Sequence, residues 1–228
     1  IDASNFDPGV AYVSIHFQQL GDFKPYIYKV SDYGKKWVNI GSNIPSSNSA
    51  FVHFIKEDPA QKGLLFAGTD NGLYVSPDDG KQWVHIKNNL PPAPVYHLAI
   101  QKNFRDLAIA TYGRGFYILD DISPLREWSK NLQELSTRLL SPRNAYRFNM
   151  QNAYHSDGRS FVTGSNPPYG ASINYYLSDT AAEKPTIFIL TPEGDKIQTI
   201  TGTNNRGFNR VWWNLAHDDI KLALLKTK

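Results

Sequence analysis

The chain has 228 residues, 41% of them hydrophobic and 13% aromatic, which is enough apolar surface for the cores of one large or two small domains. The sequence contains no cysteine and no apolar stretch near the roughly 20 residues that cross a bilayer, so disulfides, thiolate chemistry and a membrane span are excluded. The net charge is +3 and the basic residues form no runs, so no nucleic-acid partner is predicted.

Histidine spacing argues against a metal site. Local ligand pairs such as HxH or HExxH need two histidines within a few residues of each other. The six histidines lie far apart, at positions 16, 53, 85, 97, 155 and 217. We therefore predict no metal ion and no cofactor.

An internal repeat organises the first half of the chain. Residues 30–37 (VSDYGKKW) match residues 76–83 (SPDDGKQW) at a spacing of 46 positions, with Asp, Gly, Lys and Trp in register. Neighbouring segments repeat in the same way: 64–69 with 106–111, and 72–75 with 115–118. Repeats of roughly 40 to 50 residues are typical of β-propeller blades. Three successive blades are therefore predicted within residues 1–128.

Short runs of β-branched and aromatic residues, separated by Gly, Asn, Asp and Pro, predict that each blade is a four-stranded antiparallel meander. Strands are expected over 51–57, 63–69, 72–76 and 82–86 in the middle blade, and over 95–101, 106–111 and 115–120 in the next. In this third blade residues 120–124 (DDISP) replace the last hairpin, so its outer strand should be altered. Three blades do not close a ring, and the sequence opens on Ile1 rather than Met, so we expect a part of a longer protein.

The repeated turn has the pattern S-x-D-x-G-x-x-W, and each of its residues has a structural reason. The Asp carboxylate can accept bonds from N–H groups of its own turn, Gly supplies a positive φ, and Trp packs the outer strand onto the blade. These residues are expected to stabilise the fold and to take no part in a site: Asp32, Gly34, Trp37, Ser76, Asp78, Gly80 and Trp83.

The second half predicts a linker and a smaller β-domain. Within the linker, 129–165, leucines at positions 132, 135, 139 and 140 have the spacing of a short helix, and 149–165 reads as loop. Residues 166–228 predict a small immunoglobulin-like β-sandwich. Its strands are expected over 172–177, 186–190, 197–201 and 208–215, with a hairpin turn at 191–196.

The repeated turn resembles the Asp-box, or BNR, repeat of sialidases, xyloglucan-degrading glycosidases and sortilin-type propellers. Three further segments are similar to large secreted bacterial BNR-repeat proteins labelled sortilin-like glycosyl hydrolases: residues 110–125 to their last blade, and residues 166–171 and 207–214 to their C-terminal sandwich. The resemblance implies an all-β chain made of the last blades of a propeller and a β-sandwich, of which residues 166–228 are expected to lack the last strands. It also implies an extracytoplasmic location, meaning secreted, periplasmic or cell-surface.

Ligands of propellers generally bind near the central axis, on the face where the loops between the second and third strands of each blade emerge; the Asp-box turns lie on the other face. Arg114 stands between two glycines, and its guanidinium could clamp a carboxylate, pack over a ring or bridge the blade to a neighbour. The remaining candidates on this face are His16, Gln18, Gln19, Asp22, Asp70, Asn71 and Tyr112.

Two functions remain open from the sequence. The first is a recognition or scaffold module that binds a glycan or a protein partner, together with the remaining blades from this or another chain. The alternative is part of a glycoside hydrolase, in which two carboxylates about 5.5 Å or about 6.5 to 9.5 Å apart would flank the sugar bond. Only Asp22 and Asp70 are candidates for such a pair on the expected face, so a full catalytic set is not assembled here.

Overall fold

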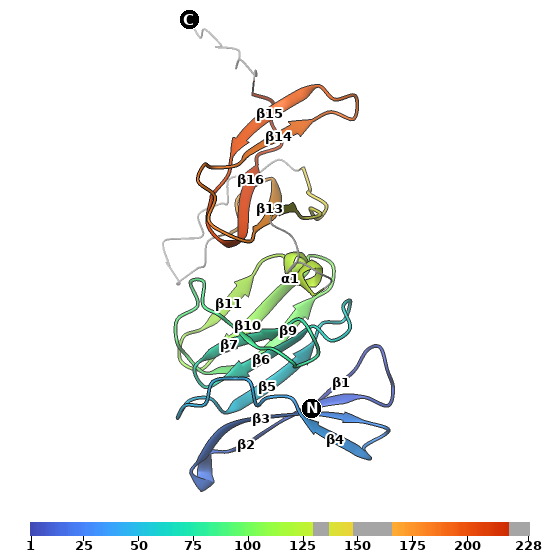
Figure 1. Cartoon of the computed structure of the whole chain (residues 1–228), viewed down its shortest axis with the longest axis vertical. Coiled ribbons are helices and arrows are strands. Elements are labelled where there is room, and N and C mark those ends of the chain that lie inside the picture. The colour runs from blue at the N-terminus through green and yellow to red at the C-terminus, as the bar shows by residue number, and fades with distance from the viewer. Residues whose placement is uncertain (130–136, 148–165, 219–228) are drawn as a thin grey trace, which may run out of the picture. The chain divides into compact units, whose positions relative to one another are not determined.

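The computed structural model describes residues 1–129, 137–147 and 166–218, and these are mostly antiparallel β-strands (Figure 1). The prediction of an all-β fold is confirmed. The chain divides into two compact units, Ile1–Asn131 (unit 1) and Leu132–Lys228 (unit 2). Neither helix in the described part of the chain has the length and apolar composition that crossing a bilayer would require.

Unit 1 contains three antiparallel sheets, each built from consecutive strands. The first sheet has the order β1-β2-β3-β4 (Asp2–Ala3, Ala11–Phe17, Asp22–Ser31, Lys36–Asn39), with a 3-10 turn, η1 (Gln18–Leu20), between β2 and β3. The second has the order β5-β6-β7-β8 (Val52–Glu57, Leu65–Thr69, Gly72–Ser76, Val84–Ile86). The third has the order β11-β10-β9 (Phe116–Leu119, Asp106–Thr111, Val95–Gln101). The strand positions predicted for the second and third repeats match the strands of the second and third sheets.

The third sheet ends differently from the other two, as the DDISP segment predicts. Helix α1 (Ser123–Trp128) follows β11 in place of a hairpin and a fourth strand. Pro124 lies in its first turn, where the missing N–H costs no hydrogen bond. The Arg126 side chain donates from Nε and Nη2, each at 3.0 Å, to the carboxylate of Asp58, which is completely buried. This ion pair fastens α1 to the loop that links β5 to β6.

The three sheets pack face to face around two cores. β6 shows why, since its side chains alternate between the two faces of the second sheet. Leu65 and Ala67 belong to a core shared with the first sheet, whereas Phe66, together with Leu64 just before the strand, belongs to a core shared with the third sheet and α1. The second sheet is therefore covered on both faces, and β6 and β7 are buried along their whole length.

A buried polar network joins the first two sheets. The Tyr12 hydroxyl lies 2.8 Å from Asp79 Oδ1 and 3.4 Å from Glu57 Oε1. Glu57 is completely buried and also accepts a bond from the Gly63 N–H at 3.1 Å, and Lys29 forms an ion pair with Asp79. Burial and the two neighbouring carboxylates raise the pKa of Tyr12 well above its usual range, so this hydroxyl remains a donor.

Replacing Tyr12 by phenylalanine should lower the free energy of unfolding by about 1–3 kcal/mol, because it removes the donor that serves the buried Glu57 carboxylate and the partly buried Asp79 carboxylate. The folded-state pKa of Tyr12 lies above the unfolded one, so its contribution is present below pH of about 10 and falls as the pH rises further. Urea denaturation at pH 7 and pH 10.5 measures both effects. Equal losses of stability in wild type and Y12F between the two pH values would contradict this assignment.

The two repeated turns, at residues 30–37 and 76–83, differ in their surroundings. In the second sheet the Ser76 hydroxyl and the Gln82 N–H both donate to Asp78 Oδ1 at 2.9 Å. The Trp83 indole is 8% exposed and donates to the carbonyl oxygen of Ile40, in the first sheet's last connection, at 2.7 Å. The equivalent Trp37 is 53% exposed and donates only within its own turn, to the Gly34 carbonyl at 2.9 Å. The indole of Trp83 is thus covered by the sheet that precedes it, whereas the indole of Trp37 is not covered by any described sheet.

Unit 2 contains a three-stranded sheet and a separate hairpin. The sheet has the order β12-β13-β16 (Thr137–Leu139, Ala171–Leu177, Gly207–Trp213), and the hairpin pairs β14 with β15 (Thr186–Leu190, Lys196–Thr201). All four strands predicted for this region are present. The helix predicted from the leucine spacing is wrong at residues 137–139, which pair with β13 instead. Residues 130–136 and the loop predicted at 149–165 lie outside the described residues.

The prediction of a helix in the linker is wrong at residues 137–139 because the leucine spacing that suggested it does not exclude a short strand. Leu139 pairs with Tyr175, and the N–H of Leu140 donates to the Asn174 carbonyl at 2.9 Å. Leu140 is 1% exposed, so its side chain is part of the packing of the sheet rather than of a helix face. Tertiary pairing decides the conformation of such a short segment.

Candidate ligand-binding site

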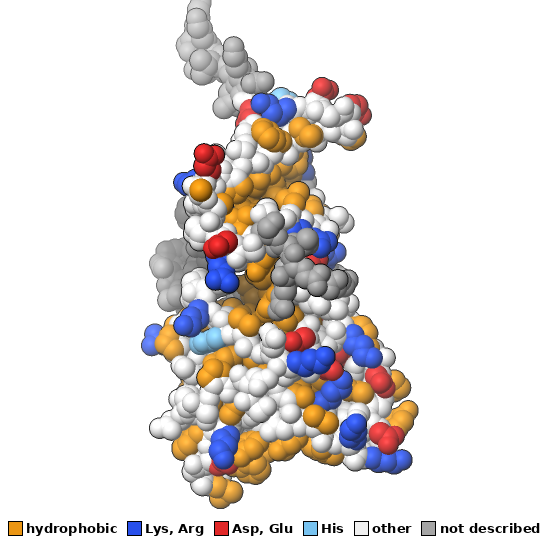
Figure 2. All heavy atoms as spheres, in the orientation of Figure 1, with side chains coloured by type: hydrophobic (Ala, Val, Ile, Leu, Met, Phe, Trp, Pro, Cys, Tyr) orange, Lys and Arg blue, Asp and Glu red, His pale blue; other side chains and the backbone are white. Residues whose placement is uncertain are grey.

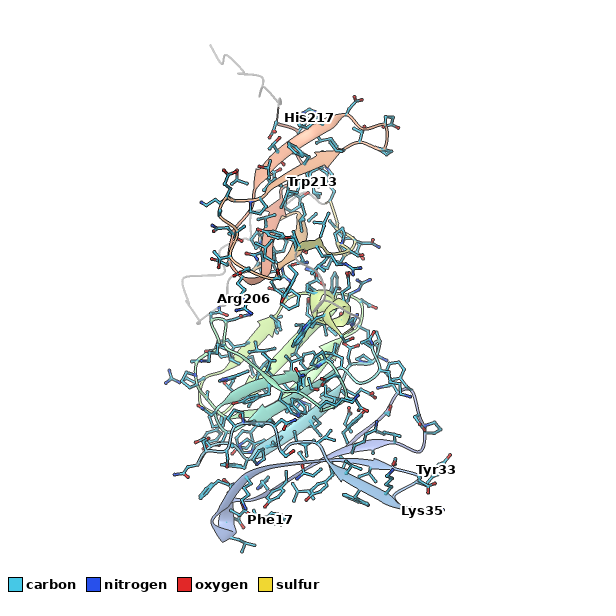
Figure 3. All side chains as sticks on the ribbon, viewed as in Figure 1. Phe17, Tyr33, Lys35, Arg206, Trp213 and His217 are labelled. Atoms are coloured by element: carbon cyan, nitrogen blue, oxygen red, sulfur yellow. The ribbon has the colours of Figure 1, made fainter. Side chains whose placement is uncertain are left out.

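The loops of the first sheet emerge at two opposite ends. Figure 3 places Phe17, at the end of β2, and Tyr33, in the turn between β3 and β4, at opposite ends of that sheet. The Tyr33 end carries the first copy of the repeated turn. The Phe17 end lies beside the start of β5, because His16 contacts Phe51 and His53 there. The start of β5 pairs with the end of β6, so the β6–β7 turn lies at the same end of unit 1.

At this end the second and third sheets repeat one local arrangement. The Asp70 N–H donates to the Phe51 carbonyl at 3.2 Å, and the Tyr112 N–H donates to the Pro94 carbonyl at 2.9 Å. Asp70 and Tyr112 thus occupy equivalent positions after β6 and β10. By the same register His53 and Tyr96, two residues after Phe51 and Pro94, occupy equivalent positions in β5 and β9. The strand pairing directs all four side chains to one end of unit 1.

These equivalent positions produce an aromatic cluster fed by all three sheets, which we call the end cluster. Its centre is His53, whose ring stacks on Tyr96 with centroids 4.2 Å apart and planes at 21°. His16 lies at 5.9 Å edge-on from the first sheet, and Tyr96 contacts Tyr112 at 5.5 Å. The end cluster comprises His16, Phe23, Phe51, His53, Tyr96 and Tyr112, with Asp70 at its edge.

The His53 ring is held in one orientation by Asp70. The distance from His53 Nε2 to Asp70 Oδ1 is 3.1 Å, and the side chain of His53 is only 6% exposed. An ionised carboxylate only accepts hydrogen bonds, so Nε2 carries the proton and Nδ1 is the acceptor in the neutral ring. No partner for Nδ1 is found within the described residues. The pair therefore offers a fixed acceptor beside the Tyr96 ring.

Two tyrosines expose much of the end cluster to solvent. Tyr112 is 70% exposed and Tyr96 is 49% exposed, whereas most aromatic rings of the two cores are buried. Isolated exposed rings are common, but adjacent exposed rings form an apolar patch of the kind that marks interaction sites. The end cluster can thus present a flat apolar surface and a hydrogen-bond acceptor to the same ligand.

The other predicted residues lie beside the end cluster rather than within it. Arg114 follows Tyr112 in the β10–β11 turn, between glycines with φ of 76°, and makes no ion pair with any described residue. Asn71 is exposed in the β6–β7 turn, next to Asp70. Gln18 and Gln19 lie in η1, and no side-chain hydrogen bond of either is found in the described part of the chain.

Asp22 is the one candidate that the strand geometry directs elsewhere. Phe23 contacts Phe51 of the end cluster at 6.0 Å, and neighbouring residues of a strand point to opposite faces. The Asp22 carboxylate accepts from the Tyr26 hydroxyl at 2.7 Å and from the Lys24 N–H at 3.1 Å. The Tyr26 bond lowers the pKa of Asp22, so this group is poorly suited to act as a general acid. The geometry brings Asp70, but not Asp22, to the end cluster.

His53 and Tyr96, the central residues of the end cluster, were not among the candidates. They lie at the start of strands rather than in loops, and loops are where the sequence directs attention. The repeat does not reveal this pair directly, because aligning Thr69 with Thr111 places position 53 opposite Val95, and only the backbone bonds to Phe51 and Pro94 bring His53 and Tyr96 into register. Chemistry-bearing residues at equivalent places of successive repeats converge when the repeats stack.

Comparison with known proteins adds no family or relative. No protein-family model matches the chain, and no curated protein matches it significantly. Among residues 1–129, 137–147 and 166–218, no three histidine or acidic side chains lie close enough together to hold a metal ion.

Proposed function

We propose that unit 1 is a recognition module, acting outside the cytoplasm, that binds glycans through the end cluster. The observation that carries this proposal is the stack of His53 on the exposed ring of Tyr96, with Tyr112 beside it. The C–H groups of a sugar ring carry a small positive charge and complement the negative face of an aromatic ring. The resemblance of the repeated turns to Asp-box propellers supports the same class of function.

Hydrogen bonding in the end cluster also suits a sugar. Each sugar hydroxyl is a donor and an acceptor, and His53 Nδ1 and the outer oxygen of Asp70 are acceptors in fixed positions. Arg114 supplies a nearby cation without an internal partner in the described structure. A protein ligand would be expected to need a larger continuous apolar area, so we favour the glycan.

Hydrolysis is less well supported than binding. A glycosidase needs a second carboxylate across the sugar bond from Asp70. Asp22 is the other candidate from the sequence, but its carboxylate accepts bonds from the Tyr26 hydroxyl and the Lys24 N–H, and it is the next residue, Phe23, that contacts the end cluster. Catalysis would therefore require a carboxylate from outside the described residues.

Glycan-array binding followed by calorimetry tests the proposal. Tyr96→Ala and Tyr112→Ala should each weaken binding of the best glycan at least tenfold, a loss of about 1.4 kcal/mol. Tyr33→Ala is the matched control, because Tyr33 is 78% exposed at the opposite end of the first sheet. No glycan bound by the wild-type chain, or equal binding by Tyr96→Ala and Tyr33→Ala, would refute the proposal.

We also propose that the outer face of the first sheet packs against a further Asp-box sheet, which fits the expected remaining blades. Rings lie in a row across this face, from Phe17 through Tyr26 and Tyr28 to Trp37, with successive centroids 5.5, 6.5 and 5.9 Å apart. Figure 2 shows apolar side chains gathered at the bottom of the view, where the first sheet lies. Tyr28 and Trp37 correspond in the repeat to Tyr74 and Trp83, which the first sheet covers.

Fluorescence of Trp37 measures whether this face is covered. In the protein expressed from its complete gene, with the other tryptophans changed to phenylalanine, Trp37 should emit at shorter wavelength and resist acrylamide quenching. In the 228-residue chain alone it should be quenched readily, since its side chain is half exposed. Equal quenching in both proteins would show that no further sheet covers this face.

A further inference from the structure

A small pocket lies beside the turn that supplies Asp70 to the end cluster. Its volume is about 270 Å³, and it lies between the β6–β7 turn, β8 and the connection from β8 to β9. Its lining combines three polar side chains with an apolar wall; the residues are Asn71, His85 and Lys87, and Ile86, Leu90, Pro91 and Pro92, together with Gly72. None of these side chains belongs to the end cluster. The two sites are connected only because Asn71 follows Asp70 in the β6–β7 turn.

One rigid turn connects the pocket to the end cluster. Asp70 bonds to His53, and the next residue, Asn71, lines the pocket. Asp70 and Asn71 are adjacent in the chain, so the end cluster and the pocket share the β6–β7 turn. The turn is fixed because the Thr69 hydroxyl donates to the Gly72 carbonyl at 3.0 Å and accepts from the Asn71 N–H at 3.2 Å.

His85 is a neutral donor group at the pocket. Its ring stacks flat on Tyr74, with centroids 4.6 Å apart and planes at 10°. Burial, and to a lesser degree the charge of Lys87, lower the pKa of His85, so the ring is uncharged at neutral pH. No hydrogen bond of this ring is found within the described residues. A glycine is required at position 72, whose φ is 130° and where a Cβ atom would lie 2.8 Å from His85 Nε2.

The chemistry of the lining selects the ligand group. The pocket is smaller than the roughly 300–1,000 Å³ of sites for drug-sized molecules, so it fits one sugar unit or its substituent. A carboxylate would lose much of its hydration against the apolar wall and find only the Lys87 ammonium as a charge partner. A bare sugar hydroxyl would leave that wall unused. An acetyl group has a methyl for the apolar wall and a carbonyl oxygen for the imidazole and amide donors.

We propose that this pocket binds the acetyl group of an N- or O-acetylated sugar in the glycan that the end cluster holds. The inference rests on the proposed function, since it names the substituent that distinguishes the bound glycan. The methyl group packs against Leu90, Pro91 and Pro92, and the carbonyl oxygen accepts from His85 or Asn71. Selectivity for acetylated over unmodified sugars follows.

Nuclear magnetic resonance of ¹³C,¹⁵N-histidine-labelled protein tests the pocket directly. Titration with methyl N-acetylglucosaminide or methyl 6-O-acetylglucoside should shift the His85 ring signals, and methyl glucoside should bind at least tenfold more weakly. The two acetylated sugars distinguish the amide from the ester. Unmoved His85 signals with both, or equal affinity for the unmodified glucoside, would overturn the inference.

Variants separate this inference from the proposed function. His85→Phe keeps the stack on Tyr74 and removes the donor, so the preference for acetylated sugars should fall at least tenfold. His97→Phe is the matched control, because His97 stacks on Phe54 outside both sites. Glycan binding without an acetyl preference would overturn the pocket inference alone. A different outcome would refute the role of the end cluster. In that case the His85 signals still shift on titration, but Tyr96→Ala leaves the glycan affinity unchanged.

Discussion

Replacing Trp83 by alanine should lower the free energy of unfolding of unit 1 by about 3–5 kcal/mol, the usual cost of removing a buried large aromatic side chain. The indole lies in the core between the first two sheets and donates to the Ile40 carbonyl at 2.7 Å. The substitution removes the packing and leaves that carbonyl without its donor. Urea denaturation followed by circular dichroism measures the change.

Trp37→Ala is the matched control within the same chain. Trp37 has the equivalent place in the repeat, but its side chain is 53% exposed. Its loss should cost less than about 1 kcal/mol, the range of exposed positions away from special features. Similar destabilisation by the two variants would mean that the stacking of the sheets does not determine the contribution of this tryptophan.

Asp58→Ala should be destabilising by about 3–5 kcal/mol, because it leaves the largely buried guanidinium of Arg126 without its counter-charge. The substitution also removes the acceptor for the N–H groups of Ala60 and Gln61, at 2.7 and 2.8 Å. Thermal and urea denaturation of the 228-residue chain report the loss. Helix α1 should detach first, since this pair fastens it to the second sheet.

The double variant Asp58→Ala/Arg126→Met tests whether the unpaired charge is the cause. Removing both charges should restore a part of the stability lost in the single variant, because methionine can be buried without a partner. Strictly additive losses would indicate that the backbone bonds of the Asp58 loop, and not the ion pair, account for the effect.

The sequence predicts the sheets of unit 1 well because two independent patterns agree there. Alternating apolar residues define strands, and the turn around Asp78 and Gly80 recurs around Asp32 and Gly34 at a fixed spacing. Gly80 carries the positive φ of 85° that such a turn requires. Local signals of this kind do not depend on the rest of the chain, so they can be interpreted before any packing is known.

The end cluster and the start of unit 2 depend on distant partners and could not be predicted in the same way. His53 gains its role from Asp70 and from Tyr96, 43 positions later, and only stacking of the sheets joins them. Thr137–Leu139 becomes a strand because it pairs with residues 175–177. Arg114 and Tyr112 could be nominated from their loop. Their different roles could not, because Tyr112 contacts the Tyr96 ring whereas Arg114 forms no ion pair with any described residue.

The order of strands has a consequence for how each unit reaches its structure. Every sheet of unit 1 is a meander of neighbouring strands, so most of its backbone pairings close short loops. In unit 2, β13 pairs with β12 before it and with β16 beyond the β14–β15 hairpin, which brings together positions 137 and 177, and 171 and 213. Closing longer loops costs more chain entropy and slows folding. On a ribosome the sheets of unit 1 can form one after another as they emerge, whereas the sheet of unit 2 must wait until Trp213 has left the exit tunnel.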